Sequence, residues 1–363
     1  MAELSKTEIE TALKEIMDPY LESDILTAKE VKSIDIEGGR VSINIQLGYP
    51  AKGFVAELAE QVKQKVEALD GVDSAEVAAD WKVVSHSVQK NLTPLPNVKN
   101  IIAVASGKGG VGKSTTSVNL ALALSAEGAN VGILDADIYG PSQPRMLGIK
   151  GQPASEDGTS LEPMENHGIQ AMSIGFLIED DTPMIWRGPM VTQALEQLIS
   201  DTRWKDLDYL IVDMPPGTGD TQLTLSQKIP VSGAVIVTTP QDIALLDARK
   251  GLKMFEKVEV SVLGIIENMS IHICSKCGNE EPIFGEGGGQ RMAEEHGVTL
   301  LGSLPLDIKI REQADNGHPT VVADPDSRSS QIYRDIAMRT AAKLAVQAKD
   351  YKAKFPKIVI QND

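Results

Sequence analysis

Residues 107–115 read GKGGVGKST, and this stretch decides the fold because it matches the phosphate-loop pattern G-x-x-x-x-G-K-[ST] from Gly107 to Ser114. Glycines let backbone N–H groups turn towards phosphate oxygens, and a helix starting at about Lys113 would point its positive end at the same anion. Lys113 then supplies a charge for the β- and γ-phosphates, and Ser114 places a hydroxyl on Mg²⁺. We therefore predict a site for ATP and Mg²⁺ whose cradle is made of Gly107, Lys108, Gly109, Gly110, Val111, Gly112, Lys113, Ser114 and Thr115.

The same glycines also fit a rival pattern, the G-x-G-x-x-G of a dinucleotide-binding fold, at Gly107, Gly109 and Gly112. Asp135 follows at roughly the spacing of the ribose-binding acid in such a fold. The glycines alone therefore do not separate the two kinds of site. The lysine and serine that follow them do, since a dinucleotide site uses neither a lysine nor a magnesium-binding hydroxyl there.

Lys108 is a second lysine inside the loop. Most loop lysines are solvated side chains on an exposed surface. The alternative is that Lys108 reaches the phosphates bound by a partner subunit, as an arginine finger does in trans.

The chain around the loop alternates short apolar runs with helical stretches. Uniformly apolar strands between helices indicate an α/β fold, a mostly parallel buried sheet with helices on both faces, here over residues 100–347. Ligands bind beyond the carboxyl ends of such strands, where the motifs of this chain follow. The expected strands are 101–105, 131–134, 209–212, 234–238, 262–266 and 300–304, and the expected closing helix is 329–347.

A small α+β domain is expected ahead of this one, over residues 1–85. Ser5 to Glu8 reads as a capping box before a helix whose apolar face includes Ile9, Leu13, Ile16 and Met17. Residues 41–47 alternate as a half-buried strand does, and they are followed by a helix over 55–69 and a strand within 72–84. Residues 86–99, polar and with two prolines, are expected to be a linker, and residues 348–363 a tail.

Three aspartates follow apolar runs. Asp213 ends one run, where an acid that holds Mg²⁺ belongs, and the loop 215–220 after it could sense the γ-phosphate. Asp135 and Asp137 follow another run, and Asp137 lies where it could orient the attacking water. Asp135 is assigned an indirect magnesium role. The competing interpretation of such residues is a helix cap after a strand.

The chain has only two cysteines, Cys274 and Cys277. A Cys-x-x-Cys pair can be a redox dithiol, half of a metal site, or incidental. Two pairs facing each other across the axis of a homodimer would supply four thiolates, which suits a [4Fe–4S] cluster or zinc. His272 and His296 are candidate ligands for zinc within one chain.

Net charge, the length of apolar runs and the amino-terminal sequence limit the classes of partner and the compartment that we expect. The formal net charge of −16 disfavours nucleic acid and anionic membranes, and no stretch approaches the ~20 apolar residues that span a bilayer. The amino terminus lacks the basic and apolar regions of a secretory signal. We therefore expect a cytoplasmic protein with no nucleic-acid or membrane partner.

These motifs together resemble a known family. Lys108 within its loop resembles the P-loop of the MinD/ArsA/nitrogenase-iron-protein class. The stretches 134–142, 213–220 and 266–270, with the cysteine pair, resemble the Mrp (ApbC) family of iron–sulfur cluster carrier ATPases. The resemblance implies an ATP-hydrolysing homodimer that binds a [4Fe–4S] cluster between its subunits and passes it to apo iron–sulfur proteins. It also implies roles for Lys108 in trans, Lys113 on phosphate, Ser114 on Mg²⁺, Asp137 on the attacking water and Asn268 in the adenine pocket.

Residues 5–85 are similar to a small metal–sulfur cluster assembly module, through Asp18-Pro19 and the turn at 69–72. Many such modules carry a cysteine after the central strand, where this chain reads LGYP at 47–50. A docking or regulatory role is therefore expected for this module. Two other functions stay open: a MinD-type positioning ATPase, although Phe355-Pro356 would interrupt a membrane-binding tail helix, and a nitrogenase-type reductase, although its cysteines are single and far apart.

Overall fold

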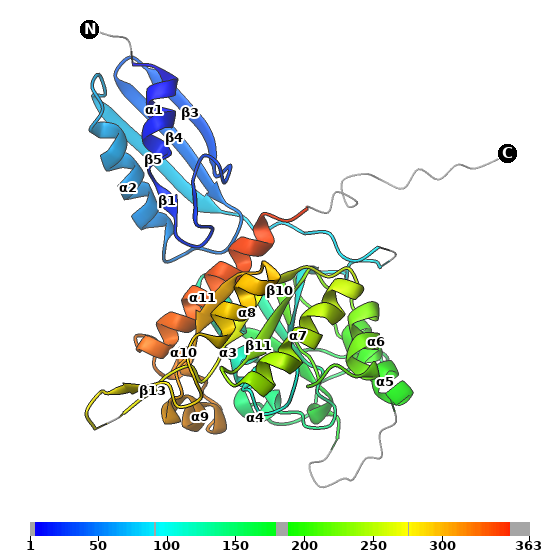
Figure 1. The fold of residues 1–363 in the computed structure, drawn as a ribbon. Coiled ribbons are helices and arrows are strands. Elements are labelled where there is room, and N and C mark those ends of the chain that lie inside the picture. The colour runs from blue at the N-terminus through cyan, green and yellow to red at the C-terminus, as the bar shows by residue number, and fades with distance from the viewer. Residues whose placement is uncertain (1–3, 91, 179–187, 275, 349–363) are drawn as a thin grey trace, which may run out of the picture.

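The computed structural model describes residues 4–90, 92–178, 188–274 and 276–348. Residues 349–363 of the expected tail lie outside the described residues. The chain folds into a small amino-terminal α+β part and a larger α/β part (Figure 1). No helix within the described ranges is long and apolar enough to cross a membrane.

The amino-terminal part is a three-stranded sheet with two helices that pack against each other. Strand β4 pairs antiparallel with β3 and parallel with β5. Every second side chain of β4 is buried, as its alternating sequence predicts. The elements are α1 (Lys6–Leu13), β1 (Met17–Asp18), β2 (Ser23–Asp24), β3 (Val31–Glu37), β4 (Arg40–Leu47), α2 (Val55–Glu67) and β5 (Ser74–Trp81).

The expected capping box is confirmed, because the Ser5 side chain accepts from the Glu8 backbone N–H and the Glu8 side chain accepts from Ser5. The prediction for Met17 is wrong. Helix α1 ends at Leu13, so Met17 lies beyond it in β1 and its side chain is 53% exposed.

The larger part is built on an eight-stranded sheet in the order β15-β12-β11-β6-β10-β7-β9-β8. Every pairing in it is parallel except that of the edge strand β8. All six expected strands are present, which confirms the fold class, whereas β8 and β9 were not expected. The strands are β6 (Val98–Ala105), β7 (Val131–Asp135), β8 (Met164–Asn166), β9 (Ile169–Ser173), β10 (Leu207–Asp213), β11 (Gly233–Thr238), β12 (Val262–Glu267) and β15 (Leu300–Ser303).

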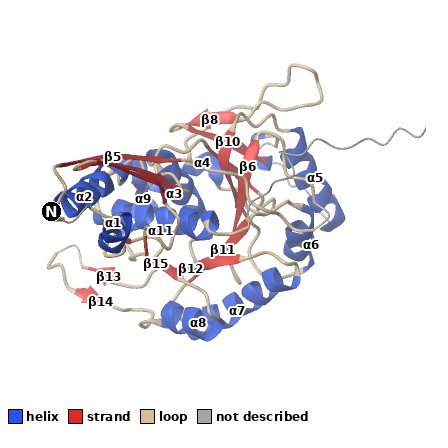
Figure 2. Ribbon diagram, turned by 90° about the horizontal axis from the view of Figure 1, so that it is seen from above, coloured by secondary structure: helices blue, strands red, loops and turns tan. Residues whose placement is uncertain are grey.

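Helices cover both faces of this sheet (Figure 2). Helices α3 and α11 pack together on one face, and α7 and α8 lie on the other. The predicted closing helix is α11. The helices are α3 (Lys113–Ala126), α4 (Gln143–Met146), α5 (Gly188–Asp201), α6 (Asp220–Lys228), α7 (Asp242–Lys257), α8 (Gly288–His296), α9 (Ile308–Asp315), α10 (Thr320–Ala323) and α11 (Arg328–Ala345), with a 3₁₀ turn at Ile174–Phe176.

The two parts meet at the carboxyl end of α3. The backbone N–H of Gly53 donates to Glu127 Oε2 at 2.8 Å, and that of Lys52 donates to the Glu127 carbonyl oxygen at 3.2 Å. A Cβ added to Gly128 would lie 2.9 Å from the ring of Trp81. The loop at 47–50, where related modules carry a cysteine, is thus next to this contact, and the side chain of Tyr49 is fully buried.

Candidate functional site

The phosphate loop lies between the end of β6 and the start of α3, as predicted. Gly110 and Gly112 both have a φ of +83°, a conformation that glycine adopts without strain. Gly107 is required for another reason: an added Cβ would lie 2.1 Å from the carbonyl carbon of Asp247 in α7. Gly109 has room, since the nearest atom to an added Cβ, on Pro216, is 4.0 Å away. Only part of the glycine pattern therefore concerns phosphate access.

Lys113 and Asp213 form the centre of the site. Lys113 Nζ lies 2.6 Å from Asp213 Oδ1, and the two side chains are 6% and 0% exposed. Lys113 Nζ is also 3.2 Å from Ser114 Oγ, so the structure brings these three predicted residues together. Ser117, one turn along α3, donates from Oγ to Asp213 Oδ1 at 2.9 Å and was not predicted. Thr115 lies between Ser114 and Ser117 on α3, and its carbonyl oxygen accepts a hydrogen bond from the Asn119 side chain.

Asp135 ends β7 directly opposite Asp213 in the neighbouring strand. Its fully buried carboxylate accepts hydrogen bonds from the backbone N–H groups of Asp137, Ser142 and Gln143 at 2.9–3.1 Å. Burial and the nearby Asp213 carboxylate raise the pKa of Asp135, and these N–H donors and Lys113 oppose the rise. In this structure Asp135 therefore holds the segment 137–143 in place.

Asp137 begins that segment at the mouth of the site. The pKa of its carboxyl group is raised by burial, and the positive charge of Lys113 opposes the rise. Gln143, the first residue of α4, ends the same segment and was not predicted as a site residue from the sequence. Gln143 Nε2 donates to Asp213 Oδ2 at 3.0 Å and to the Ser114 carbonyl oxygen at 3.1 Å.

The donor set fits Mg²⁺. Mg²⁺ prefers oxygen ligands, and Ser114 and Asp213 provide a hydroxyl and a carboxylate that both lie within hydrogen-bond distance of Lys113 Nζ. A further oxygen, Gln143 Oε1, is buried and accepts no hydrogen bond from the described part of the chain. Ser114 and Asp213 are thus placed to hold the ion, directly or through water.

Asn268 holds the phosphate loop through a hydrogen bond to the loop backbone. Its side-chain amide donates to the Val111 carbonyl oxygen at 2.9 Å, and the residue is 8% exposed. An added Cβ on Gly112 would lie 2.1 Å from Asn268 Nδ2, so Asn268 leaves no room for a side chain at position 112. Lys108 is partly exposed on the same loop and makes no ion pair within the described part of the chain.

The cysteines lie on a small hairpin, β13 (His272–Ile273) and β14 (Glu280–Glu281), that follows β12 after a short connection. Cys277 is exposed, Cys274 is partly exposed, and both are free thiols. The backbone N–H groups of Lys276 and Cys277, and then the Cys277 thiol, lower the pKa of Cys274, which favours the thiolate that metals bind. Arg328 of α11 anchors the hairpin through Glu280 at 2.6 Å.

The single-chain zinc alternative gains no support. Within the residues that the structure describes, no group of three or more His, Cys, Asp or Glu side chains could hold a metal ion. His272 Nδ1 instead lies 3.3 Å from the Leu306 carbonyl oxygen, and His296 ends α8.

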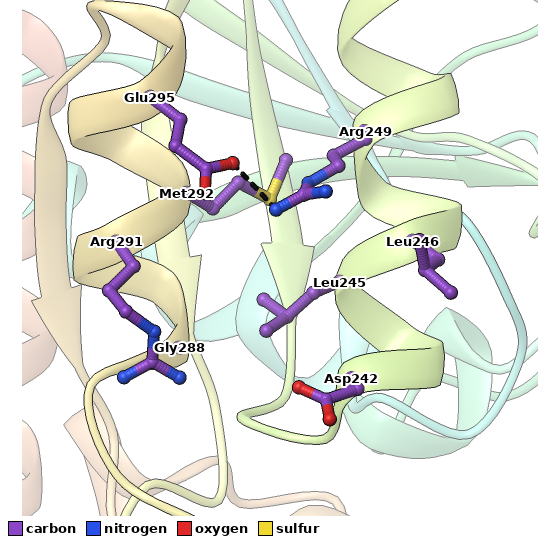
Figure 3. Close-up of a pocket in the computed structure, with 8 residues that line it drawn as sticks. All are labelled: Asp242, Leu245, Leu246, Arg249, Gly288, Arg291, Met292 and Glu295. Atoms are coloured by element: carbon purple, nitrogen blue, oxygen red, sulfur yellow. Dashed lines mark hydrogen bonds and ion pairs between the residues drawn. The ribbon is translucent and has the colours of Figure 1, made fainter.

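One pocket lies apart from these residues, between α7 and α8. It has a volume of about 230 Å³, and an ion pair of 2.6 Å between Arg249 and Glu295 crosses it (Figure 3). None of the predicted site residues lines it. A larger cavity of about 820 Å³ adjoins Pro141 and Pro144 in the segment after Asp137.

The chain is similar to known proteins over both of its parts. Residues 97–341 match the family model described as NUBPL iron-transfer P-loop NTPase, and residues 6–79 match one described as iron-sulfur cluster assembly protein. A protein from Pseudomonas fragi named iron-sulfur cluster carrier protein is 60% identical to this chain, over 76% of this chain and 97% of the relative. A protein of the same name from Escherichia coli K12 is 53% identical, over 92% of this chain and 90% of the relative.

A solved structure gives the same result for the fold. A nucleotide-binding protein from *Archaeoglobus fulgidus*, in complex with ADP, superposes with a TM-score of 0.55 and 36% identity, covering 64% of this chain and 90% of that one. The resemblance seen in the phosphate loop, the aspartates and the cysteine pair is thereby confirmed. The chain belongs to the NUBPL iron-transfer P-loop NTPase family.

Proposed function

We propose that this chain is a cytoplasmic carrier that binds a [4Fe–4S] cluster between two copies of itself, hydrolyses ATP, and passes the cluster to apo iron–sulfur proteins. The relatives named iron-sulfur cluster carrier protein support the cargo. The ADP complex of the *Archaeoglobus* protein supports the nucleotide.

The observation that carries the proposal is the continuity between the two sites. Asn268 contacts the phosphate loop, and Cys274 follows only six residues later in the chain. Between them, Ser270 Oγ and His272 Nδ1 lie against carbonyl oxygens of the 304–306 segment. A change in the loop on nucleotide binding therefore has a short connection along the chain to the thiols, through a stretch that hydrogen bonds hold against the 304–306 segment.

The residues of the cradle and the nearby aspartates have separate roles in the proposed hydrolysis. Lys113 now pairs with Asp213, and a bound β,γ-phosphate would compete for its ammonium group. Mg²⁺, when bound, neutralises charge on the phosphate oxygens. Asp137 orients the attacking water, and Lys108 of a second copy neutralises charge that develops on the transferred phosphoryl group.

Anaerobic reconstitution tests the cargo and its ligands. Wild-type protein should take up iron and sulfide as one cluster per two chains and become dimeric on size-exclusion chromatography with light scattering. Replacing both Cys274 and Cys277 with alanine should abolish loading, whereas the control His272→Ala should load normally. Equal loading of the double cysteine variant would overturn the proposal.

Subunit mixing tests the role of Lys108. Lys108→Ala and Lys113→Ala should each lack ATPase activity. Mixed dimers contain one site with an intact Lys113 that receives Lys108 from the other chain, so the mixture should regain activity. If both variants are inactive alone and the mixture is equally inactive, Lys108 acts within its own chain, and an active Lys108→Ala would show that Lys108 is not needed. Full-rate cluster delivery by Lys113→Ala would show that hydrolysis is dispensable.

A further inference from the structure

Gln143 occupies the space between the phosphate-loop helix and Asp213. Its side chain is 1% exposed, although it is polar and belongs to a short surface helix. Its backbone N–H donates to Asp135 at 3.0 Å, and its amide nitrogen donates to both Asp213 and the Ser114 carbonyl. One residue therefore contacts both residues assigned to magnesium and the aspartate that shapes the 137–143 segment.

These contacts fix the orientation of the amide. Both atoms that face Nε2 are acceptors, a carboxylate oxygen and a carbonyl oxygen, so a flipped amide would place oxygen against oxygen. Oε1 must therefore point away from them. It is buried and has no partner among the residues that the structure describes, which costs free energy unless a donor is supplied from elsewhere.

An orphaned oxygen alone does not assign a metal. Gln89 has a similar pattern, with Nε2 donating to the Ser226 and Ile229 carbonyls and Oε1 buried with no partner in the described ranges. Gln89, however, contacts neither predicted magnesium residue. The distinguishing feature of Gln143 is that its amide joins Ser114 and Asp213, and Mg²⁺ in proteins usually keeps several water ligands that are strong donors.

We propose that Gln143 is a positioning residue of the magnesium site. It holds the Asp213 carboxylate through Nε2, and its Oε1 accepts a hydrogen bond from a water bound to Mg²⁺. Because its backbone is tied to Asp135, it also links the segment 137–143 to the presence of the ion. This inference rests on the proposed ATP and Mg²⁺ site.

Nucleotide and metal titrations test the assignment. Binding of a fluorescent ADP is measured with excess EDTA, and Mg²⁺ is titrated onto the ADP complex in separate samples without EDTA. Gln143→Met keeps the side-chain length without either polar atom, and Gln143→Leu is a second variant in case the first fails to fold. Gln89→Met is the matched buried control.

Outer-shell partners of metal ligands typically contribute ~10–100-fold to metal affinity, so the Gln143 variants should weaken Mg²⁺ binding by about that factor. Their ADP affinity in EDTA should stay within about twofold of wild type, and Gln89→Met should change neither quantity. Equal weakening with and without Mg²⁺ would mean that Gln143 only packs the loop and would overturn the inference, as would unchanged Mg²⁺ affinity. Absence of ADP binding by the wild type would instead overturn the proposed function itself.

Discussion

The side-chain amide of Asn268 donates a hydrogen bond of 2.9 Å to the carbonyl oxygen of Val111, joining the end of strand β12 to the middle of the phosphate loop. The family resemblance assigned Asn268 to the adenine pocket. Its place behind the loop indicates a second contribution, which is to hold the loop in its binding conformation.

Replacing Asn268 with alanine should weaken nucleotide binding by about tenfold. The change leaves a buried carbonyl oxygen without its donor, which costs ~1–2 kcal/mol. Fluorescent ATP and GTP analogues would measure the effect, with the exposed Asn44→Ala as control. Equal losses for both nucleotides indicate loop support, whereas a loss confined to ATP would contradict it and favour adenine recognition.

Two neighbouring glycines should respond differently to alanine. Gly107→Ala places a methyl group against the backbone of Asp247 in α7 and should destabilise the protein by ~1–3 kcal/mol. Gly109→Ala has open space and should change stability by no more than ~0.5 kcal/mol. Thermal unfolding of both variants measures this, and similar melting temperatures would contradict the proposed packing role of Gly107.

The amino-terminal part should lose stability as the pH rises, because of Glu30. This residue is 3% exposed, and burial followed by the Asp18 carboxylate raises its pKa from 4.5 to about 9. Between these two values the folded state keeps a proton that the unfolded state releases. A group with a raised acid pKa therefore costs up to ~1.4 kcal/mol of stability for each pH unit in that window.

Glu30→Gln removes this titration, so its melting temperature should rise relative to wild type as the pH increases. Calorimetry of the full chain at several pH values provides the measurement. Glu37→Gln, at an exposed position in β3, the strand that begins directly after Glu30, should follow the wild-type curve. Parallel curves for wild type and Glu30→Gln would show that Glu30 is ionised in the folded protein.

Glu127→Ala should loosen the contact between the two parts of the chain. The variant loses the carboxylate that accepts from the Gly53 N–H, a charge-assisted bond of ~1.5–3 kcal/mol. Small-angle scattering should report a larger radius of gyration, and Trp81 beside Gly128 should change its fluorescence. Glu57→Ala on α2 is the control, and an unchanged radius would mean that other contacts suffice.

Much of the fold could be predicted from the sequence, because buried parallel strands consist of continuous apolar runs that are easy to recognise. β6 and β10 are of this kind. The strands β8 and β9 escaped because they are short, lie at one edge of the sheet and include polar residues such as Asn166 and Gln170. Length and apolarity, the two signals of a central strand, are both weak there.

The site was predictable where chemistry follows chain order and not where it depends on packing. Lys113 and Ser114 belong to one motif, and Asp213 was placed by the strand that precedes it. Ser117 and Gln143 reach the same carboxylate from a helix interior and a helix start, and no spacing rule in one sequence points to them. A polar residue at an inward helix position is the only signal that either one carried.

The cysteine hairpin has two residues in each strand and stands outside the main sheet, with Cys277 open to solvent. In the proposed carrier, where the hairpins of two copies share the cluster, an acceptor protein would approach this pair of hairpins without the sheet of either copy opening. Handover would then proceed at the surface, one thiolate replacing another, at a pace set by the acceptor's own cysteines. The same position would expose a cluster held there to oxygen and chelators, so the cluster would survive only if it were passed on quickly.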